Sequence, residues 1–544
     1  MVIIQRYFDQ IFDIIERYRQ MCGILAYFRD PSSSTEVNDE FQEYDEQHLS
    51  SLNQSLCFES STELFNKLIP YIVRRGPNYA SFRALSDVNA TFFSSILSLR
   101  TPFTKQSVLV NDRYVLQYNG ELYNDQTLDY EGSDNDTAFI MSLLSLLPVE
   151  DVIKKCYGEF AYTITDLVEK KVYFGRDSVG KRSLSYRIDG KDIYITSTSG
   201  KCADFSDCLA GVIYIYDLKT RSLDVSKSIN DHPFKVSDQV DEGLRNLEYY
   251  KSELYNKLNQ AVYQRVVSIH PLHLENNNIS VLFSGGLDCS VVTAILCEQL
   301  IKTRRNTNTV IELLNVGFEN PRTGKMPADS PDRILALKST ELLKRLYPGC
   351  NIKLIEVDVP YEEYLSKRET VVDLIYPKNT EMDLSIAIAF YFASRGRGNV
   401  MEGSNRIKYN RTGIVLFSGL GADELYGGYH KLANKSEEEL TVELQRQIEG
   451  IHDRNLNRDD KVISDHGVEV RYPFLDEEVI RFSVSLPLNY KINKNILRVM
   501  ARDLLGLEFI SDEPKRAIQF GARSAKMTKD SNKKGTDLLK IPTQ

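Results

Sequence analysis

The stretch VLFSGGLDCS, residues 281–290, determines the fold that we expect for the second half of the chain. An apolar run leads into a turn formed by Ser284, Gly285 and Gly286, and a helical pattern follows the turn. Glycines at a strand-to-helix turn let backbone N–H groups approach an anion, and the positive end of the helix adds to the attraction. Asp288 suits a neighbouring phosphate only with a cation between them, so the segment predicts a phosphate site with Mg²⁺.

Strand-like and helix-like runs alternate on both sides of this turn. Three further apolar runs are typical of strands: IELLNVGF (311–318), IKLIEVDV (352–359) and GIVLFSG (413–419). Helical patterns occupy 249–269 and 288–301. This alternation predicts an α/β domain with a doubly wound parallel sheet.

A second glycine-rich loop lies in VLFSGLGADELYGGY, residues 415–429. Its glycines again allow the backbone to approach a nucleotide, and Asp423 offers a second carboxylate for a metal ion. A Walker phosphate loop would need Gly-Lys followed by Ser or Thr, which residues 281–290 lack. The two loops therefore indicate a nucleotide site of another kind.

The first half of the chain has a different pattern. Short β-like runs dominate it, and DTAFIMSLLSLL at 136–147 is the clearest helical segment. The polar, acidic residues 31–60 favour a loop or a partly disordered insertion. We expect an extension at 1–21 that is absent from the mature protein, a first domain at 22–216, a linker at 217–243, a second domain at 244–526 and a polar tail at 527–544.

Composition excludes several classes of protein. The 544 residues are too many for one core, so we expect two large domains. A net charge of -9 gives no electrostatic footprint for nucleic acid, and no apolar run reaches the roughly 20 residues that span a membrane. Eight scattered cysteines without a CxxC pair favour reduced thiols in a cytoplasmic enzyme. Seven histidines, none beside a candidate nucleophile, argue against a Ser-His-Asp hydrolase.

The two glycine loops resemble those of glutamine-hydrolysing asparagine synthetases, whose synthetase domain is an ATP-pyrophosphatase. Such enzymes cleave ATP between the α- and β-phosphates and pass AMP to a carboxylate. The resemblance implies Mg²⁺ on Asp288 and Asp423, and Lys494 of KNILR as the group that neutralises charge on the α-phosphorus. Lys515 is a weaker candidate for phosphate contact. The implied ATP site consists of Leu282, Ser284, Gly285, Gly286, Asp288, Val316, Gly317, Ser418 and Gly419.

Three segments of the first half resemble the glutaminase of the same family: RRGPN (74–78), QYNGELYN (117–124) and GSDNDTAFI (132–140). The resemblance implies an αββα N-terminal-nucleophile (Ntn) hydrolase, which is the class II glutamine amidotransferase fold. The first domain should therefore bind glutamine and release ammonia from it.

The same resemblance assigns a role to each residue of the glutaminase site. The guanidinium of Arg75 suits the α-carboxylate of glutamine, and Asp134 would hold its α-amino group. Asn119 and Glu121 are further glutamine-binding candidates. The Asn119 amide and the Gly120 backbone N–H would form the oxyanion hole.

RQMCGILAYF, residues 19–28, contains the candidate nucleophile, Cys22. In this class the cysteine thiolate attacks the amide carbon, and its own free α-amine, with a pKa near 7.7–8.0, is the base. An acylated amine has no basicity, so Cys22 cannot act behind Gln20 and Met21. We favour translation from Met21 followed by its removal, or removal of the whole extension. The alternative is a retained extension and an inactive glutaminase.

Three features depart from the asparagine synthetase pattern. Leu420 occupies the position of a glutamate that lies near the acyl-adenylate, and leucine cannot accept a proton. The helix at 383–396 lacks a basic residue expected near the substrate, and Cys289 replaces a serine. AIQFGAR and IYPKNTEMDLSIA resemble a divergent branch, the asparagine synthetase domain-containing proteins.

The expected reaction uses glutamine, ATP and a carboxylate, most simply that of aspartate, and makes asparagine, glutamate, AMP and pyrophosphate. One alternative keeps this chemistry with another carboxylate. Ring closure, as in β-lactam synthetases, is disfavoured by Cys22. A second alternative is a pseudoenzyme that keeps the fold for partner binding. A homodimer is compatible with each of these.

Overall fold

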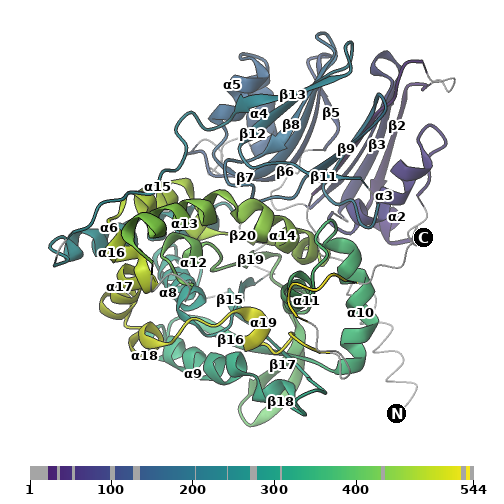
Figure 1. Ribbon diagram of the computed structural model, residues 1–544. Coiled ribbons are helices and arrows are strands. Elements are labelled where there is room, and N and C mark those ends of the chain that lie inside the picture. Colours follow the sequence, from purple (N-terminus) through teal and green to yellow (C-terminus); the bar gives the residue numbers. More distant parts are fainter. Residues whose placement is uncertain are drawn as a thin grey trace, which may run out of the picture. The chain divides into compact units, whose positions relative to one another are not determined.

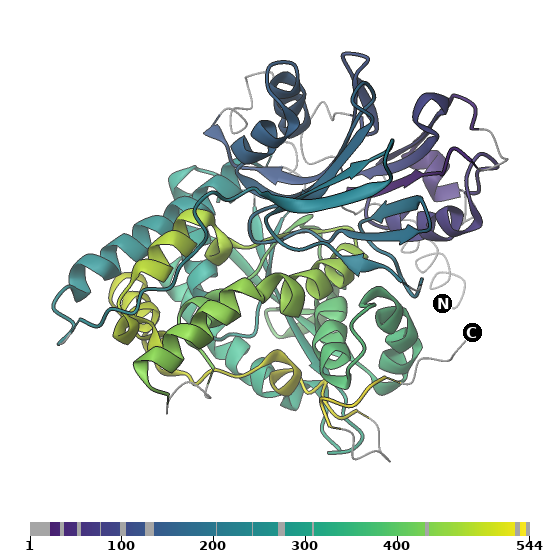
Figure 2. The ribbon, with the colours of Figure 1, turned by 45° about the horizontal axis from the view of Figure 1, so that its top comes forward.

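The computed structural model describes residues 22–32, 37–51, 56–76, 78–97, 105–125, 135–202, 204–241, 243–269, 278–306, 309–429, 435–527 and 534–539. The chain forms two compact units, Met1–Ile229 with Ile463–Glu469, and Asn230–Val462 with Val470–Gln544. Figures 1 and 2 show the elements of each. Within the described segments, no helix combines the length and the apolar character needed to cross a membrane.

The first unit contains two antiparallel sheets. In spatial order, the strands of one are β11 (Ser206–Asp207), β9 (Ser185–Asp189), β10 (Asp192–Thr196), β1 (Gly23–Phe28), β4 (Ala90–Ile96), β3 (Tyr79–Leu85) and β2 (Glu40–Asp45). Those of the other are β13 (Ser222–Ser228), β12 (Val212–Asp217), β8 (Lys171–Arg176), β7 (Gly158–Asp166), β6 (Tyr114–Leu122) and β5 (Val108–Val110).

Alternating side chains of β1 and β6 generate the layers of this unit, because successive residues of a strand point to opposite faces. Ile24 of β1 and Val115 of β6 belong to one buried cluster between the sheets. Leu25 packs instead with helix α3 (Glu63–Val73). Leu116 packs with helices α4 (Asp136–Leu144) and α5 (Val149–Lys155). Figure 1 shows α3 outside one sheet and α4 and α5 outside the other, which confirms the predicted αββα arrangement.

The outer helices begin at capping residues in the sequence. Thr62 Oγ1 accepts a hydrogen bond from the backbone N–H of Phe65 at 3.1 Å, which starts α3. Asn135 Oδ1 accepts one from the backbone N–H of Ala138 at 3.0 Å, which starts α4. Such caps satisfy amides that the first helical turn leaves without partners. The helix predicted at 136–147 is thus confirmed, and it ends at Leu144.

Two boundaries of the first unit differ from expectation. The acidic residues 31–60 contain strand β2, which pairs with β3, and helix α2 (Glu46–Ser51). Strand β13 lies inside the expected linker and extends the first unit to Ile229. Both strands are edge strands whose side chains are mostly exposed, so neither shows the apolar alternation that signals a strand.

The second unit is built on one mixed sheet. In spatial order, its strands are β18 (Asn405–Asn410), β17 (Arg397–Glu402), β16 (Asn351–Val359), β15 (Val310–Phe318), β14 (Ile279–Leu282), β19 (Val415–Phe417) and β20 (Glu469–Arg471). The four strands from β16 to β19 are parallel, as the sequence predicts. The hairpin of β17 and β18 joins β16 in antiparallel orientation.

The strand order reverses beside β14. The chain runs from β14 to β15 and β16 through helices α8 (Leu287–Lys302) and α9 (Pro331–Leu346). It then continues through α10 (Tyr361–Leu374), α11 (Glu381–Arg395) and the hairpin of β17 and β18 to β19, which lies on the other side of β14. Right-handed crossovers therefore place the two pairs of helices on opposite faces of the sheet. Ligands of such sheets bind where the order reverses, at the carboxyl ends of the strands.

The remaining helices of this unit flank the sheet and its loops. They are α6 (Leu247–Val267), α12 (Ala422–Leu425), α13 (Glu437–Glu449), α14 (Asn457–Ser464), α15 (Glu477–Ser485), α16 (Leu488–Lys491), α17 (Asn495–Leu505), α18 (Glu508–Asp512) and α19 (Ile518–Gly521). The described part of the expected polar tail, 534–539, is hydrogen-bonded to α11. Gly535 O and Asp537 O accept hydrogen bonds from the first amides of α11, those of Met382 and Glu381, each at 2.9 Å.

Candidate functional site

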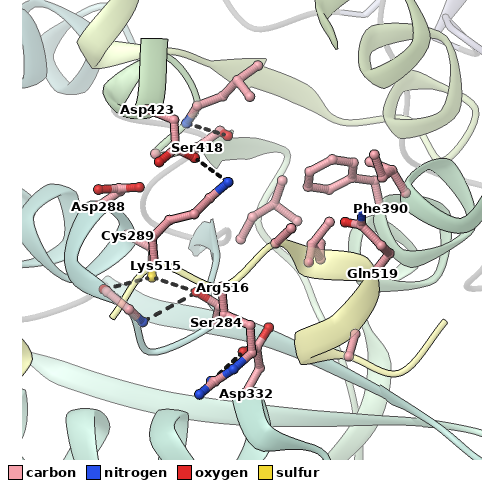
Figure 3. Close-up of a pocket in the computed structure, with 18 of the residues that line it drawn as sticks. Ser284, Asp288, Cys289, Asp332, Phe390, Ser418, Asp423, Lys515, Arg516 and Gln519 are labelled. Carbon is pink, nitrogen blue, oxygen red and sulfur yellow. Dashed lines mark hydrogen bonds and ion pairs between the residues drawn. The ribbon is translucent and has the colours of Figure 1, made fainter. Parts of the chain in front are cut away.

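A cavity of about 450 Å³ lies at the carboxyl ends of β14, β15 and β19. Figure 3 shows side chains from both glycine loops around it. Its lining includes Leu282, Ser284, Gly286, Asp288, Val316, Ser418, Gly419, Asp423, Lys494 and Lys515. The structure thus brings together, at the strand-order reversal, most residues that the sequence assigns to ATP.

Gly285 and Gly317, the other two predicted ATP residues, are not part of the lining. Gly285 has φ +81°, and a Cβ there would lie 2.5 Å from the backbone nitrogen of Ala336. A Cβ on Gly317 would lie 2.5 Å from the carbonyl oxygen of Pro327. Both glycines therefore serve close backbone packing behind the site.

The first loop is held by local hydrogen bonds. Ser284 Oγ accepts from the backbone N–H of Gly286 at 3.3 Å, and α8 begins directly after that glycine. The thiol of Cys289 donates to the carbonyl oxygen of Gly286 at 3.3 Å and lies 3.5 Å from Ser284 Oγ. The Cys289 thiol therefore makes contacts that are also possible for a serine hydroxyl. The cysteine in place of the serine thus keeps hydrogen bonds within the loop.

Lys494 joins the two loops. Its Nζ lies 2.6 Å from Asp288 Oδ2 and 2.7 Å from Asp423 Oδ1. Lys494 is 2% exposed, and its backbone is left-handed at φ +60°, where α17 begins. Burial alone would lower the pKa of Lys494, but the two carboxylates raise it well above the usual value. The loops thus share one buried ammonium.

Two basic side chains extend the charged side of the cavity. Lys515 Nζ lies 3.4 Å from Asp423 Oδ2 and 4.1 Å from the centre of the Tyr429 ring. Arg516 Nη1 lies 3.4 Å from Asp332 Oδ1. Figure 3 shows the two side chains facing each other. Burial raises the pKa of Asp332 to about 7, although Arg516 opposes this. Asp332 and Arg516 carry no motif, and sequence reasoning missed them.

A second wall of the cavity is apolar. Met382, Ile386 and Phe390 line it from one face of α11, at intervals of four residues, and Leu420 lines it from the second loop. Arg395, the basic residue of 383–396, pairs with Glu363 at 2.6 Å and is not part of the cavity lining. This wall offers contact for a substrate but no charge.

Three charged residues lie next to the apolar wall. Arg458 Nη1 lies 3.2 Å from Asp383 Oδ1, and Arg458 Nε donates to Asp459 Oδ1 at 2.8 Å. All three line the cavity and are at least nine-tenths buried. Sequence reasoning missed Arg458 and Asp459, because charged residues inside a helix carry no signal of burial.

The candidate glutaminase site lies in the first unit, around Cys22. Its thiol is 3.9 Å from the carbonyl oxygen of Leu97. Desolvation raises the pKa of the Cys22 thiol to about 12, and the charges of Glu469, Arg75 and Glu121 also act on it. The thiol is therefore protonated at neutral pH and needs a base to become a nucleophile.

The oxyanion-hole candidates lie in the middle of β6. Gly120 has φ +148°, and a Cβ there would lie 2.0 Å from the carbonyl oxygen of Glu159 on β7. Only glycine fits this position without a shift of β7. Asn119 and Glu121 on either side are both buried. Asp134, the candidate for the α-amino group, lies outside the described residues.

Hydrogen bonds within the first unit hold Arg75 in place. It donates through Nε to the carbonyl oxygen of Cys22 at 3.2 Å, and through Nη1 to Ser464 Oγ at 2.5 Å and Ser183 Oγ at 3.4 Å. Ser464 belongs to segment 463–469, which also contains Glu469. Sequence reasoning did not place this segment beside Cys22, because hundreds of residues separate the two.

Both units match known protein families. The family model "Asparagine synthase" matches residues 253–439 and 432–539, and "Glutamine amidotransferase domain" matches residues 96–202. The chain is 54% identical to asparagine synthetase domain-containing protein YML096W of Saccharomyces cerevisiae, over 96% of this chain and 99% of the relative. It is 28% identical to asparagine synthetase domain-containing protein 1 of Bos taurus, over 87% of this chain and 94% of the relative. It is 27% identical to the glutamine-hydrolysing asparagine synthetase of Cricetulus griseus, over 84% of this chain and 81% of the relative.

Proposed function

Since this chain belongs to the asparagine synthase family, we propose that it is a glutamine-dependent ligase that uses ATP to convert a carboxylate into an amide. The first unit hydrolyses glutamine at Cys22, and the second activates the carboxylate as an acyl-adenylate. Ammonia then displaces AMP. Aspartate is the simplest acceptor, with asparagine as the product.

The position of Lys494 is the observation that carries this proposal. Its ammonium is buried in the cavity and lies within 2.7 Å of one carboxylate from each glycine loop. A cation at this point faces the place where the loops would hold the phosphates, and it would neutralise charge on the α-phosphorus as pyrophosphate leaves. Lys515, 3.4 Å from Asp423, adds a second positive charge for the leaving group.

Asp288 and Asp423 are the proposed Mg²⁺ ligands. The structure shows that they converge on one point, because both contact the same ammonium nitrogen. No larger cluster of metal-binding side chains occurs in the described part of the chain. Two carboxylates suit Mg²⁺, which completes its coordination with substrate phosphates and water. When bound, the ion would neutralise the departing pyrophosphate.

The glutaminase half of the proposal depends on a free α-amine at Cys22. The Asn119 amide and the Gly120 N–H would hold the oxyanion, and Arg75 would bind the glutamine carboxylate. Because the pKa of the Cys22 thiol is raised to about 12, the thiol is protonated at neutral pH and needs a local base to become a nucleophile. We propose that the α-amine of Cys22 is this base, after removal of residues 1–21.

The acceptor is the less constrained part of the proposal. Ile386, Phe390 and Leu420 form an apolar wall where aspartate would need charged partners. This wall supports the alternative of a different carboxylate, with the same ATP and glutamine chemistry. A pseudoenzyme is the second candidate function, and Leu420 favours it because it replaces a glutamate of the family pattern.

A pyrophosphate-release assay tests the proposal. The chain beginning at Cys22 is incubated with MgATP, glutamine and either L-aspartate or one of a panel of carboxylic acids. We expect acid-dependent release of pyrophosphate and AMP, together with glutamate from glutamine. Glutamate with aspartate-dependent AMP identifies an asparagine synthetase. AMP with another acid only identifies a different acceptor, and absence of both products identifies a pseudoenzyme.

We also propose a cytoplasmic location. All eight cysteines of the chain lie among the described residues and are free thiols. Reduced thiols are typical of proteins in the cytoplasm. Fractionation of cells that express a tagged chain tests this proposal.

A further inference from the structure

Asp459 lines the cavity of the second unit and has a buried carboxylate oxygen without a hydrogen-bond partner in the described structure. The residue lies on α14, is 1% exposed and lines the same cavity as Lys494 and Leu420. Its Oδ1 accepts a hydrogen bond from Arg458, whereas its Oδ2 has no hydrogen-bond partner in the described structure. A buried carboxylate oxygen without a donor is costly, so this oxygen indicates a donor that arrives with the substrates.

The carboxylate oxygen without a partner is specific to Asp459, and the ion pair with Arg458 does not cause it, as Asp383 shows. Asp383 also contacts Arg458, at 3.2 Å, and its second oxygen accepts from the Thr380 hydroxyl at 2.5 Å. The two carboxylates thus share one guanidinium, but both oxygens of Asp383 have partners. Asp459 is the one of the pair with acceptor capacity left for a ligand.

The proposed reaction lacks a base at the position where the family pattern has one. Ammonia that attacks an acyl-adenylate must lose a proton, and Leu420 cannot accept it. Building on the proposed function, we propose that Asp459 is the catalytic base of amide formation and takes the proton that ammonia loses as it attacks the acyl carbon. Asp459 would thus take the role for which the glutamate of the family pattern, replaced here by Leu420, is suited.

The nitrogen lone pair of ammonia forms a bond to the acyl carbon, and the bond from that carbon to the phosphate oxygen of AMP breaks. AMP leaves with the electron pair, and one proton moves from nitrogen to Asp459 Oδ2. The products are the amide, AMP and a protonated Asp459, which returns its proton to water.

The electrostatic environment supports this role. Burial, with smaller contributions from the charges of Asp383 and Asp460, raises the pKa of Asp459 to about 6, although Arg458 opposes the rise. A base with a pKa near neutrality combines the correct protonation state with a useful driving force. Because the carboxylate must be ionised to act, amide formation from ammonia should rise with pH through about 6.

The test separates the two half-reactions. The acid that gives the largest pyrophosphate release in the screen above is used as the probe, with ammonium chloride replacing glutamine. Acid-dependent exchange of labelled pyrophosphate into ATP reports acyl-adenylate formation. Amide and AMP production report the second half. D459N should retain the exchange and lose amide formation by about 100-fold or more.

Two further variants separate chemistry from structure. D383N removes the other carboxylate partner of Arg458, so it is the matched control, and it should affect both half-reactions alike. L420E in the D459N background supplies a carboxylate from the second glycine loop, and recovery of amide formation supports a chemical role. Amide formation at the wild-type rate in D459N, or loss of both half-reactions together, overturns the assignment of Asp459. Failure of the wild-type chain to exchange pyrophosphate with any acid overturns the proposed function itself.

Discussion

Lys494 Nζ lies 2.6 Å from Asp288 Oδ2, although 206 residues separate the two in the sequence. This contact joins the start of α17 to the start of α8, and Asp423 completes it from the second glycine loop. One lysine thereby compensates two buried carboxylates. Any cation that enters between Asp288 and Asp423 must compete with this ammonium, which links metal binding to the position of Lys494.

K494A should therefore abolish acid-dependent pyrophosphate release and also destabilise the protein. Removing one partner from a buried ion pair costs about 3–5 kcal/mol, because the remaining charges are left uncompensated. Added Mg²⁺ should restore part of the stability, since Asp288 and Asp423 are then free to bind it. Thermal unfolding with and without MgCl₂ measures this, and Mg²⁺ should raise the Tm of K494A more than that of the wild type.

K344A is the matched control for this prediction. Lys344 pairs with Glu341 on the exposed side of α9, where both side chains are in contact with water. Such surface pairs contribute about 0–1 kcal/mol, so the Tm should hardly change, with or without Mg²⁺. Equal Mg²⁺ responses in K494A and the wild type would contradict a shared site for the metal and the ammonium.

G120A should inactivate the glutaminase and leave the synthetase half active. A Cβ at Gly120 would lie 2.0 Å from the carbonyl oxygen of Glu159, so β6 and β7 must separate where the oxyanion hole is proposed. G190A is its control, because Gly190 also has a left-handed φ of +61° but nothing within 4 Å of its Cβ. Glutamate release should disappear in G120A and persist in G190A. Ammonia-dependent amide formation should survive in both variants.

The parts of the fold that the sequence predicts are those with buried periodic patterns. The parallel strands around β14 are continuous apolar runs, and the helix at 136–147 has a clear helical pattern. Strands β2 and β13 were missed, because exposed edge strands lack an apolar face. The strand order could not be read from single segments, since it depends on pairings between distant parts of the chain.

The residues of the candidate site also fall into those that the sequence predicts and those that it does not. Ser284 and Asp423 are predictable because they lie in glycine-rich loops, which the sequence itself reveals where a strand pattern gives way to a helix pattern. Asp332, Arg458 and Asp459 were missed, since each is a charged residue in a helix that becomes functional only through burial and a distant partner. The position of segment 463–469, which reaches Arg75 through Ser464, was missed for the same reason.

D332N should stabilise the protein more at pH 8 than at pH 5. Burial raises the folded-state pKa of Asp332 to about 7, from an ordinary value of 3.8. A raised carboxyl pKa means that the folded state binds the proton more tightly, so its stability falls as the pH rises from about 4 to about 7. Asparagine stays neutral and avoids a loss on the order of 4 kcal/mol at most. Urea unfolding at both pH values measures the difference, and an equal gain at pH 5 and pH 8 would contradict the prediction.

Glutamine hydrolysis should require Cys22 as the first residue of the chain. The pKa of its thiol, about 12, leaves almost no thiolate at neutral pH, so the proton must pass to a neighbouring base as the sulfur attacks. A free α-amine has a pKa near 7.7–8.0, whereas the amide nitrogen behind Met21 has no basicity. The chain beginning at Cys22 should therefore release glutamate at a rate that rises with pH through about 8, and the chain of 544 residues should release none. C22A in the shorter chain controls for contaminating glutaminase. Full activity in a chain that still carries residues 1–21, verified by intact mass, would show that another group accepts the proton.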